Sequence, residues 1–162
     1  MSTWLVPHNR LTADQRRAVE LPMDTHGVIS GGTGSGKTQV ILHRAKYLSS
    51  RFAVPPDRFR IVVFTSTLCR SLASACPLLD LPPECITTFR DFCVEYYRTH
   101  IDEKIPWVNY GLGTLPRPDF WIMRPDVESH ASRLLEPTYD FLLVDEGQDL
   151  DIQAFFLFRA LS

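Results

Sequence analysis

Five of the eight glycines in this 162-residue chain lie between positions 27 and 36. Residues 31–38 read Gly-Gly-Thr-Gly-Ser-Gly-Lys-Thr, which fits the spacing GxxxxGK(S/T). An apolar stretch precedes this segment and a helix-like stretch follows it, as the pattern requires. Glycines let the backbone turn tightly and direct its N–H groups inward, so phosphate oxygens can bind at the positive end of the following helix. The sequence therefore predicts a phosphate-binding loop between a strand and a helix.

The side chains at the end of this loop differ in their expected roles. Lys37 is expected to neutralise the β and γ phosphates of a nucleotide. The hydroxyl of Thr38 is expected to join the coordination of a Mg²⁺ ion that keeps most of its waters. The predicted nucleotide-binding residues of the loop are Gly32, Thr33, Gly34, Ser35, Gly36, Lys37 and Thr38. The alternative is an ordinary glycine-rich turn without a ligand.

A second motif, residues 141–146, is an apolar run that ends in two carboxylates. Ligands bind at the carboxyl edge of parallel sheets, where such a pair would lie. Asp145 is expected to hold the Mg²⁺, and Glu146 to accept a proton from the water that attacks the γ-phosphate. The alternative is that Asp145, Glu146 and Asp149 only cap the helix that begins near Leu150.

Short apolar runs alternate with amphipathic stretches along the chain. The pattern predicts strands at 27–30, 61–65, 84–88 and 141–145 and helices at 13–20, 37–48, 89–97 and 151–161. Such alternation predicts an α/β fold of the P-loop NTPase class, in which helices flank a parallel sheet.

Prolines gather late in the chain, where they are expected to interrupt regular structure; they are Pro106, Pro116, Pro118, Pro125 and Pro137. We therefore divide the chain into a lobe of residues 1–99 and 137–162 and a proline-rich insertion of residues 100–136. Aromatic residues of the insertion could stack bases or instead pin an irregular loop to the core; they are Trp107, Tyr110, Phe120 and Trp121.

The charge balance limits the partners of the chain. The chain has seventeen Lys and Arg residues and nineteen Asp and Glu residues, which gives a net charge of −2. A protein that holds nucleic acid by charge alone has a basic excess, so any nucleic-acid contact here must be local. No window approaches the about 18 continuous apolar residues of a membrane span, and the N-terminus lacks a signal-peptide pattern. We expect no membrane partner and a cytoplasmic location.

Four segments in order resemble the first lobe of superfamily 1 helicases of the UvrD/Rep type. They are 11–15 (Leu-Thr-Ala-Asp-Gln), the phosphate loop, 86–89 (Ile-Thr-Thr-Phe) and 144–149 (Val-Asp-Glu-Gly-Gln-Asp). The resemblance implies a RecA-like ATP-binding lobe that uses ATP and Mg²⁺ to move along or unwind a strand. It also implies that Gln15 recognises adenine through its amide and that Gln148 senses the γ-phosphate.

The resemblance further implies contacts with single-stranded DNA or RNA. Residues 61–70 occupy the place of a family segment that touches the strand, and Thr65, Thr67 and Arg70 can contact phosphates there. Thr88 and Phe89 fit the second strand-contacting segment. The alternative for Phe89 is a core side chain at a helix entry.

The last expected helix, 151–161, is apolar nearly all round, and such a helix is normally buried on more than one side. We therefore expect a fold that is incomplete at its C-terminus and is completed by a second RecA-like lobe or a partner chain, an oligomer being the alternative. The resemblance implies that the second lobe supplies arginines to the γ-phosphate, so the isolated chain should hydrolyse ATP weakly. Two other classes stay open: a nucleotide-binding regulatory or interaction module, and, less favoured, a P-loop small-molecule kinase.

Overall fold

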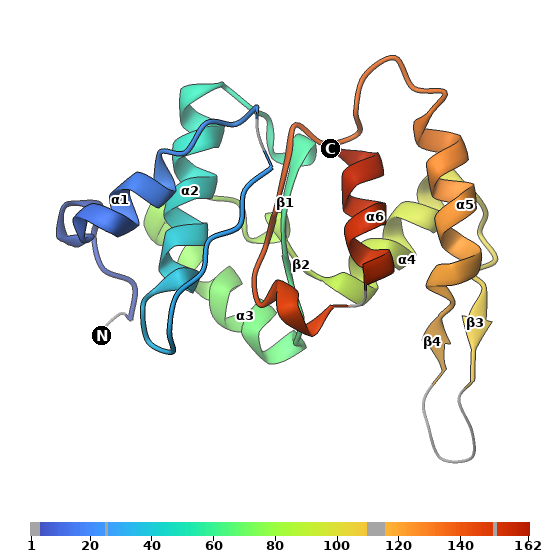
Figure 1. Ribbon diagram of the computed structural model, residues 1–162, viewed down its shortest axis with the longest axis horizontal. Coiled ribbons are helices and arrows are strands. Elements are labelled where there is room, and N and C mark those ends of the chain that lie inside the picture. Colours follow the sequence, from blue (N-terminus) through green and yellow to red (C-terminus); the bar gives the residue numbers. More distant parts are fainter. Residues whose placement is uncertain (1–3, 25, 110–115, 151) are drawn as a thin grey trace.

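The computed structural model describes residues 4–24, 26–109, 116–150 and 152–162. A parallel sheet with the strand order β2-β1-β5 lies at its centre (Figure 1). The strands are β1 (Phe59–Val63), β2 (Ile86–Thr88) and β5 (Phe141–Val144). In this register Val63 lies opposite Thr88, and Val62 lies opposite Val144. The predicted α/β class with a parallel sheet is confirmed.

Helices cover both faces of the sheet. They are α1 (Ala13–Val19), α2 (Lys37–Arg51), α3 (Ser66–Ala75), α4 (Phe89–His100), α5 (Phe120–Ala131) and α6 (Ile152–Leu161). Short 3₁₀ helices lie at His8–Arg10, Pro56–Arg58, Cys76–Leu79, Pro83–Cys85 and Gly147–Asp149. None of the helices within the described ranges has the length and apolar content that a membrane crossing requires.

The alternating side chains of β1 separate two hydrophobic clusters. Ile61 and Val63 belong to a cluster that includes residues of α2 and α3. Val62, between them in the sequence, belongs to a second cluster with residues of α4, α5 and α6. Successive side chains of a strand point to opposite faces, so one strand, buried at every residue except Arg60, supports both layers of helices.

The sequence places most elements correctly but shifts several ends. The strand expected at 61–65 is β1, which ends at Val63, because Thr65 instead caps α3 by accepting a hydrogen bond from the Leu68 N–H. The strand expected at 84–88 is β2 and begins at Ile86, because Pro83–Cys85 forms a 3₁₀ helix. The helices expected at 37–48 and 89–97 each continue three residues further, as α2 and α4.

The strand expected at 27–30 is wrong. This segment pairs with no strand of the described sheet, and the Val28 side chain is 95% exposed. A strand needs partners for its backbone groups, and it is favoured where its apolar side chains are buried. The backbone has no strand partner, and Ile29 is only partly buried against the cluster of Leu11, Val19 and Val40, so the phosphate loop follows an irregular segment.

The proline-rich region contains more regular structure than we expected. β3 (Trp107–Val108) and β4 (Arg117–Pro118) form an antiparallel pair, and α5 follows with Pro125 inside it. A proline inside a helix removes one backbone donor. Burial of Met123 and Val127 against α4 and α6 offsets this loss. The region thus shares a core with the lobe, and the proposed division into lobe and insertion stays a prediction.

Candidate functional site

The phosphate loop and the acidic end of β5 lie side by side. The Thr38 hydroxyl donates a hydrogen bond to Asp145 Oδ2 at 2.9 Å, although 107 residues separate the two. The backbone N–H of Asp145 donates to the Val62 carbonyl at 2.9 Å, so the β1–β5 ladder continues by one bond and fixes the position of the carboxylate. Two motifs that the sequence predicts separately therefore meet at the carboxyl edge of the sheet.

Two glycines of the loop have backbone angles that favour glycine. Gly34 has φ +77° and Gly36 has φ +83°, both in the left-handed region. A Cβ atom on Gly36 would also lie 2.6 Å from Gln15 Nε2, closer than any real contact. Any other residue at Gly36 would therefore strain the loop and displace Gln15.

Lys37 begins α2 and bends back over the loop. Its ammonium donates hydrogen bonds to the carbonyls of Gly31 at 3.0 Å and Gly32 at 3.4 Å. The loop residues 31–35 are exposed. A phosphate group can therefore reach both the loop and the Lys37 ammonium without rearrangement of the core.

Gln15 joins α1 to the loop. Its backbone N–H donates to Thr12 Oγ1 at 3.2 Å, and its Oε1 accepts from the Thr12 N–H at 2.9 Å. Its Nε2 donates to the Ser35 carbonyl at 2.9 Å. Arg44 of α2 holds the end of α1 in place by donating to three carbonyls, of Val19, Leu21 and Pro22. Gln15 is thus next to the phosphate loop, and its contact with adenine stays a prediction.

The Asp145 carboxyl lies in the interior of the molecule, with only 2% of the residue exposed. Burial raises its pKa above the ordinary value, and the nearby Glu146 carboxylate adds to the rise. The hydrogen bond from Thr38 and the charge of Lys37 act in the opposite direction. A buried anion of this kind gains from a bound cation.

The oxygen atoms of Thr38 and Asp145 fit a Mg²⁺ ion. Mg²⁺ prefers oxygen ligands and usually binds through one or two carboxylates together with substrate phosphates and waters. A hydroxyl and a carboxylate oxygen 2.9 Å apart, next to a phosphate loop, provide that set. In the part of the chain that the structure describes, no three or more His, Cys, Asp or Glu side chains are grouped so that they could hold a metal ion together.

Replacement of Asp145 by asparagine is expected to raise the melting temperature of the nucleotide-free chain at neutral pH. Because the native pKa lies above the unfolded value, the folded state binds the proton more tightly, and stability falls as pH rises through the window between the two values. The neutral amide removes this loss. Thermal unfolding of both proteins from pH 4 to pH 8 measures the effect.

The difference between the two melting temperatures should shrink toward pH 4. Asp149→Asn is the matched control, since Asp149 is an exposed carboxylate in the same turn. It should change the melting temperature little at any pH. A lower melting temperature for Asp145→Asn at pH 7 would contradict the account that burial of the Asp145 charge destabilises the nucleotide-free fold.

Glu146 follows directly in an unusual conformation. Its φ is +52°, in the left-handed region, and its Oε2 accepts a hydrogen bond from Gln148 Nε2 at 2.5 Å. The Glu146 side chain makes no capping bond to the 3₁₀ helix that it precedes. A Cβ atom on Gly147 would lie 3.4 Å from the Phe155 ring. α6 therefore packs closely on the turn that carries the two acids.

The predicted strand contacts separate into two groups. Thr65, Thr67 and Arg70 are exposed at the start of α3, where β1 ends. Thr88 is buried, and its hydroxyl both donates to the Asp91 carboxylate at 2.7 Å and accepts from the Asp91 N–H at 3.1 Å. The hydroxyls of Thr65 and Thr88 both cap a helix, but the first group is exposed and can be reached by a ligand, whereas Thr88 is buried.

Phe89 is a core side chain, as the alternative interpretation proposed. Only 8% of it is exposed, and its ring centroid lies 4.8 Å from that of Phe120 and 5.6 Å from that of Phe158. Sequence reasoning missed Phe64, which is 51% exposed directly after β1. The expected strand 61–65 included Phe64, so the sequence predicted a side chain inside the sheet and not an exposed ring.

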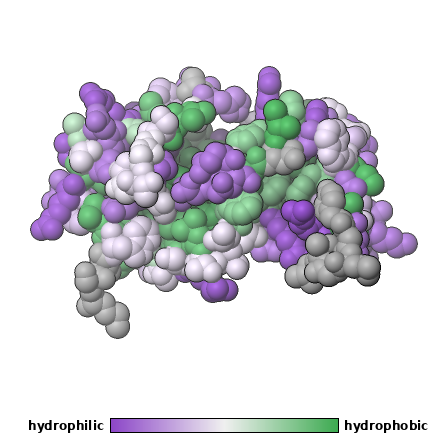
Figure 2. All heavy atoms as spheres, turned by 60° about the horizontal axis from the view of Figure 1, so that its bottom comes forward, coloured by the Kyte–Doolittle hydropathy of each residue, from purple (hydrophilic) through white to green (hydrophobic). Residues whose placement is uncertain are grey.

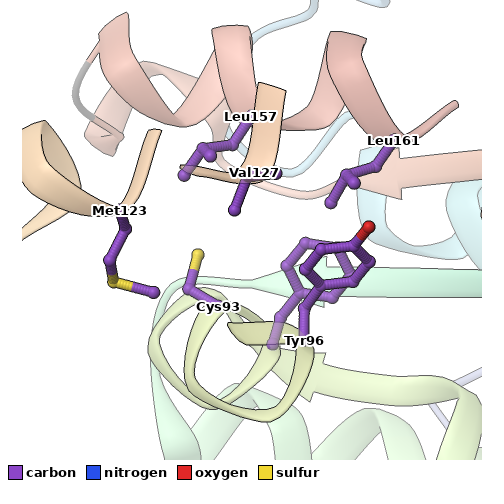
Figure 3. A pocket seen from close by; sticks show the side chains of 7 residues that line it. Cys93, Tyr96, Met123, Val127, Leu157 and Leu161 are labelled. Carbon is purple, nitrogen blue, oxygen red and sulfur yellow. The ribbon is translucent and has the colours of Figure 1, made fainter. Parts of the chain in front are cut away.

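Two cavities within the described residues are lined by side chains other than those of this edge. One, of about 10 Å³, is lined by apolar side chains of α4, α5 and α6, including Cys93, Met123 and Leu157 (Figure 3). This volume holds at most a single water, so it is a packing gap. A larger open hollow of about 490 Å³ lies between residues 20–24 and the end of α2. The candidate site is instead an open edge that carries a phosphate loop, a buried acid and an exposed helix start.

A phosphate loop that opens a helix beside an acid at the end of a parallel strand defines a P-loop NTPase domain. The chain belongs to the family described as "AAA domain", whose model matches residues 15–162. This domain is found in UvrD/Rep-like helicases, which confirms the resemblance drawn from the four motifs.

One curated relative is named "Putative ATP-dependent DNA helicase YjcD", from Bacillus subtilis (strain 168). It is 36% identical over 66 residues, which make up 40% of this chain and 8% of the relative. The match thus spans a small part of the relative's length. No solved structure matches the chain significantly. The comparisons support an ATP-binding, helicase-like domain.

Proposed function

We propose that this chain is the ATP-binding lobe of a UvrD-like helicase, which hydrolyses ATP to move along or unwind DNA once a second RecA-like lobe or a partner chain completes the site. In this proposal residues 1–99 and 137–162 form the lobe and residues 100–136 the insertion. The contact between Thr38 and Asp145 carries the proposal, because it joins the phosphate loop to the acidic strand end. The family match and the name of the relative support it. A cytoplasmic location is part of the same proposal.

Different residues of the site would bind the phosphates, the adenine and the Mg²⁺ ion. The backbone of the loop from Gly32 to Gly36 donates N–H groups to the phosphates, and Lys37 exchanges its bonds to Gly31 and Gly32 for bonds to phosphate oxygens. Gln15 reads the adenine. Thr38 and Asp145 would hold Mg²⁺, which neutralises phosphate charge when bound.

Two further side chains would serve hydrolysis. The Glu146 carboxylate accepts the proton of the attacking water, and a carboxylate within hydrogen-bond reach is suited to that role. Gln148 donates to the same carboxylate. It can therefore orient Glu146 and respond to the presence of a γ-phosphate.

The strand would run along the carboxyl edge of the sheet. Thr65, Thr67 and Arg70 are exposed there and can contact its phosphates, and the exposed ring of Phe64 can stack on a base. Thr88 and Phe89 would support this surface from the interior. Single-stranded DNA is the proposed partner, with RNA as the alternative.

A second candidate function is a nucleotide-binding regulatory module that does not move on nucleic acid. The net charge of −2 favours it, because strand-tracking surfaces are usually basic. The two candidates share the nucleotide site and differ in their response to a strand.

The weak ATP hydrolysis expected of the chain alone should therefore rise when single-stranded DNA is added. Release of radiolabelled phosphate, with and without a (dT)₂₀ strand, measures this response, and a blunt duplex of the same length is the control. ATP binding without any response to the strand would favour the regulatory module. Absence of ATP binding would contradict both candidates.

A further inference from the structure

An exposed tryptophan and an arginine are paired at the border between the lobe and the insertion. Trp107 lies on β3 and is 46% exposed, and Arg90 is an exposed residue in the first turn of α4. The Arg90 guanidinium carbon lies 5.4 Å from the centroid of the Trp107 ring. A planar cation and an aromatic ring thus face solvent together.

The pair continues the proposed strand surface. Val63 and Thr88 are opposite each other in the sheet, so Phe64 and Phe89 leave neighbouring strands side by side, and Arg90 comes next. In Figure 1 α3 and the β3–β4 pair both lie toward the lower edge of the molecule. Figure 2 turns this edge forward and shows hydrophobic and hydrophilic areas close together on it. The sheet pairing thus brings the start of α4, which carries Arg90, next to the end of β1, and Arg90 in turn contacts Trp107.

Trp107 is held on a well-supported backbone. Ile105 is buried in the second cluster, and the Pro106 carbonyl accepts a hydrogen bond from the Asp119 N–H at 2.8 Å. Pro118, opposite Trp107 in the strand pair, is also buried. A ring that is presented in this way loses little freedom when a ligand binds.

The aromatic residues of the insertion do not share one role. Phe120 packs on Phe89 and so pins the insertion to the core. Tyr110 lies outside the described residues. Trp107 and Trp121 are exposed, so the pinning interpretation does not account for them.

We propose that Arg90 and Trp107 form a base-stacking site for single-stranded nucleic acid, one step beyond the contacts at the start of α3. The inference rests on the proposed function, because it assumes that a strand lies along this edge. An unpaired base can stack on an indole ring or on a guanidinium plane, whereas bases inside a duplex are covered by their neighbours. The positive charge of Arg90 also attracts the adjacent phosphate.

Binding of fluorescein-labelled (dT)₂₀ to the full chain, followed by anisotropy, tests the site. Trp107→Ala should weaken binding about tenfold or more, and Trp107→Phe should recover much of the loss. Arg90→Ala should weaken binding and lower the slope of affinity against salt by about 1. Arg90→Lys should restore the slope but not the full affinity, because lysine keeps the charge and loses the planar group.

The far end of α2 supplies matched controls. Phe52 is exposed there, and the Arg51 guanidinium carbon lies 5.8 Å from its ring centroid. α2 begins at the phosphate loop, so its 15 residues place this second pair about 22 Å away from that edge. Phe52→Ala and Arg51→Ala remove the same kinds of group and should leave strand binding nearly unchanged.

A fluorescence measurement keeps the proposal testable if Trp107→Ala fails to fold. The chain has three tryptophans, so Trp4→Phe with Trp121→Phe leaves Trp107 alone. Unlabelled (dT)₂₀ should quench this single tryptophan in a saturable way. The quenching midpoint should agree with the anisotropy value.

The outcomes separate this inference from the proposed function. Normal strand binding by Trp107→Ala, with no quenching of Trp107, would overturn the stacking site and leave the proposed function intact. Failure of the parent chain to bind the strand would overturn both the stacking site and the strand-dependent function. Mg·ATP binding by the same preparation then shows whether the nucleotide site still stands.

Discussion

Replacement of Lys37 by alanine is expected to remove most of the affinity for ATP and, with it, the rise in melting temperature that Mg·ATP gives the parent chain. The Lys37 ammonium donates hydrogen bonds to the Gly31 and Gly32 carbonyls. In the proposed complex it donates to phosphate oxygens instead. Hydrogen bonds to charged groups contribute about 1.5–3 kcal/mol each, so the loss of affinity should be about 100-fold.

A melting curve measures this loss because a ligand that binds only the folded state stabilises it by RT ln(1 + [L]/Kd). At an ATP concentration of 100 Kd the parent gains about 2.7 kcal/mol, and a variant that binds 100-fold more weakly gains about 0.4 kcal/mol. Lys46→Ala is the matched control on the same helix, since Lys46 pairs with Asp80 at 3.5 Å away from the loop. An Mg·ATP shift that is equal in Lys37→Ala and the parent would contradict the site assignment.

Replacement of Glu146 by glutamine is expected to leave ATP binding in place and to lower the hydrolysis rate by about 10²–10⁴-fold, the usual contribution of a general base. The amide has nearly the same shape but cannot accept the proton of the attacking water. Gln148 can still donate to the amide oxygen, so the turn should keep its structure. Single-turnover hydrolysis in the presence of the strand, with the Mg·ATP melting shift measured in parallel, separates chemistry from binding.

Glu103→Gln is the control for this variant. Glu103 is exposed in the loop after α4, and its replacement removes the same charge at a distant place. It should hydrolyse ATP at the parent rate. Hydrolysis by Glu146→Gln at the parent rate would mean that another group acts as the base. Loss of the melting shift in Glu146→Gln would instead assign the residue to nucleotide binding.

The parts of the site that could be predicted from sequence depend on local chemistry. The glycines at 34 and 36 have positive φ, as a tight phosphate loop requires, and Lys37 begins α2 as expected. The apolar run before Asp145 is a strand because four consecutive bulky residues pair well with β1. These features depend on residue type and spacing, which a sequence displays directly.

The features that sequence missed depend on partners that are distant in the chain. The segment 27–30 has strand-forming residues but no neighbouring strand in the described sheet. Pro125 lies inside a helix because α5 is held by α4 and α6, which no local rule reveals. The exposure of Trp107 and the burial of Phe89 likewise follow from packing. The sequence around Trp107 and around Phe89 is compatible with either an exposed or a buried ring.

The hydrogen bond between Thr38 and Asp145 also has a consequence for the order of folding. It closes a loop of more than one hundred residues, and contacts of such long range form late because chain entropy opposes them. During synthesis the phosphate loop leaves the ribosome well before β5 exists. A nascent chain can therefore fold its first helices but cannot assemble the paired Thr38 and Asp145 oxygens until β5 has joined the sheet.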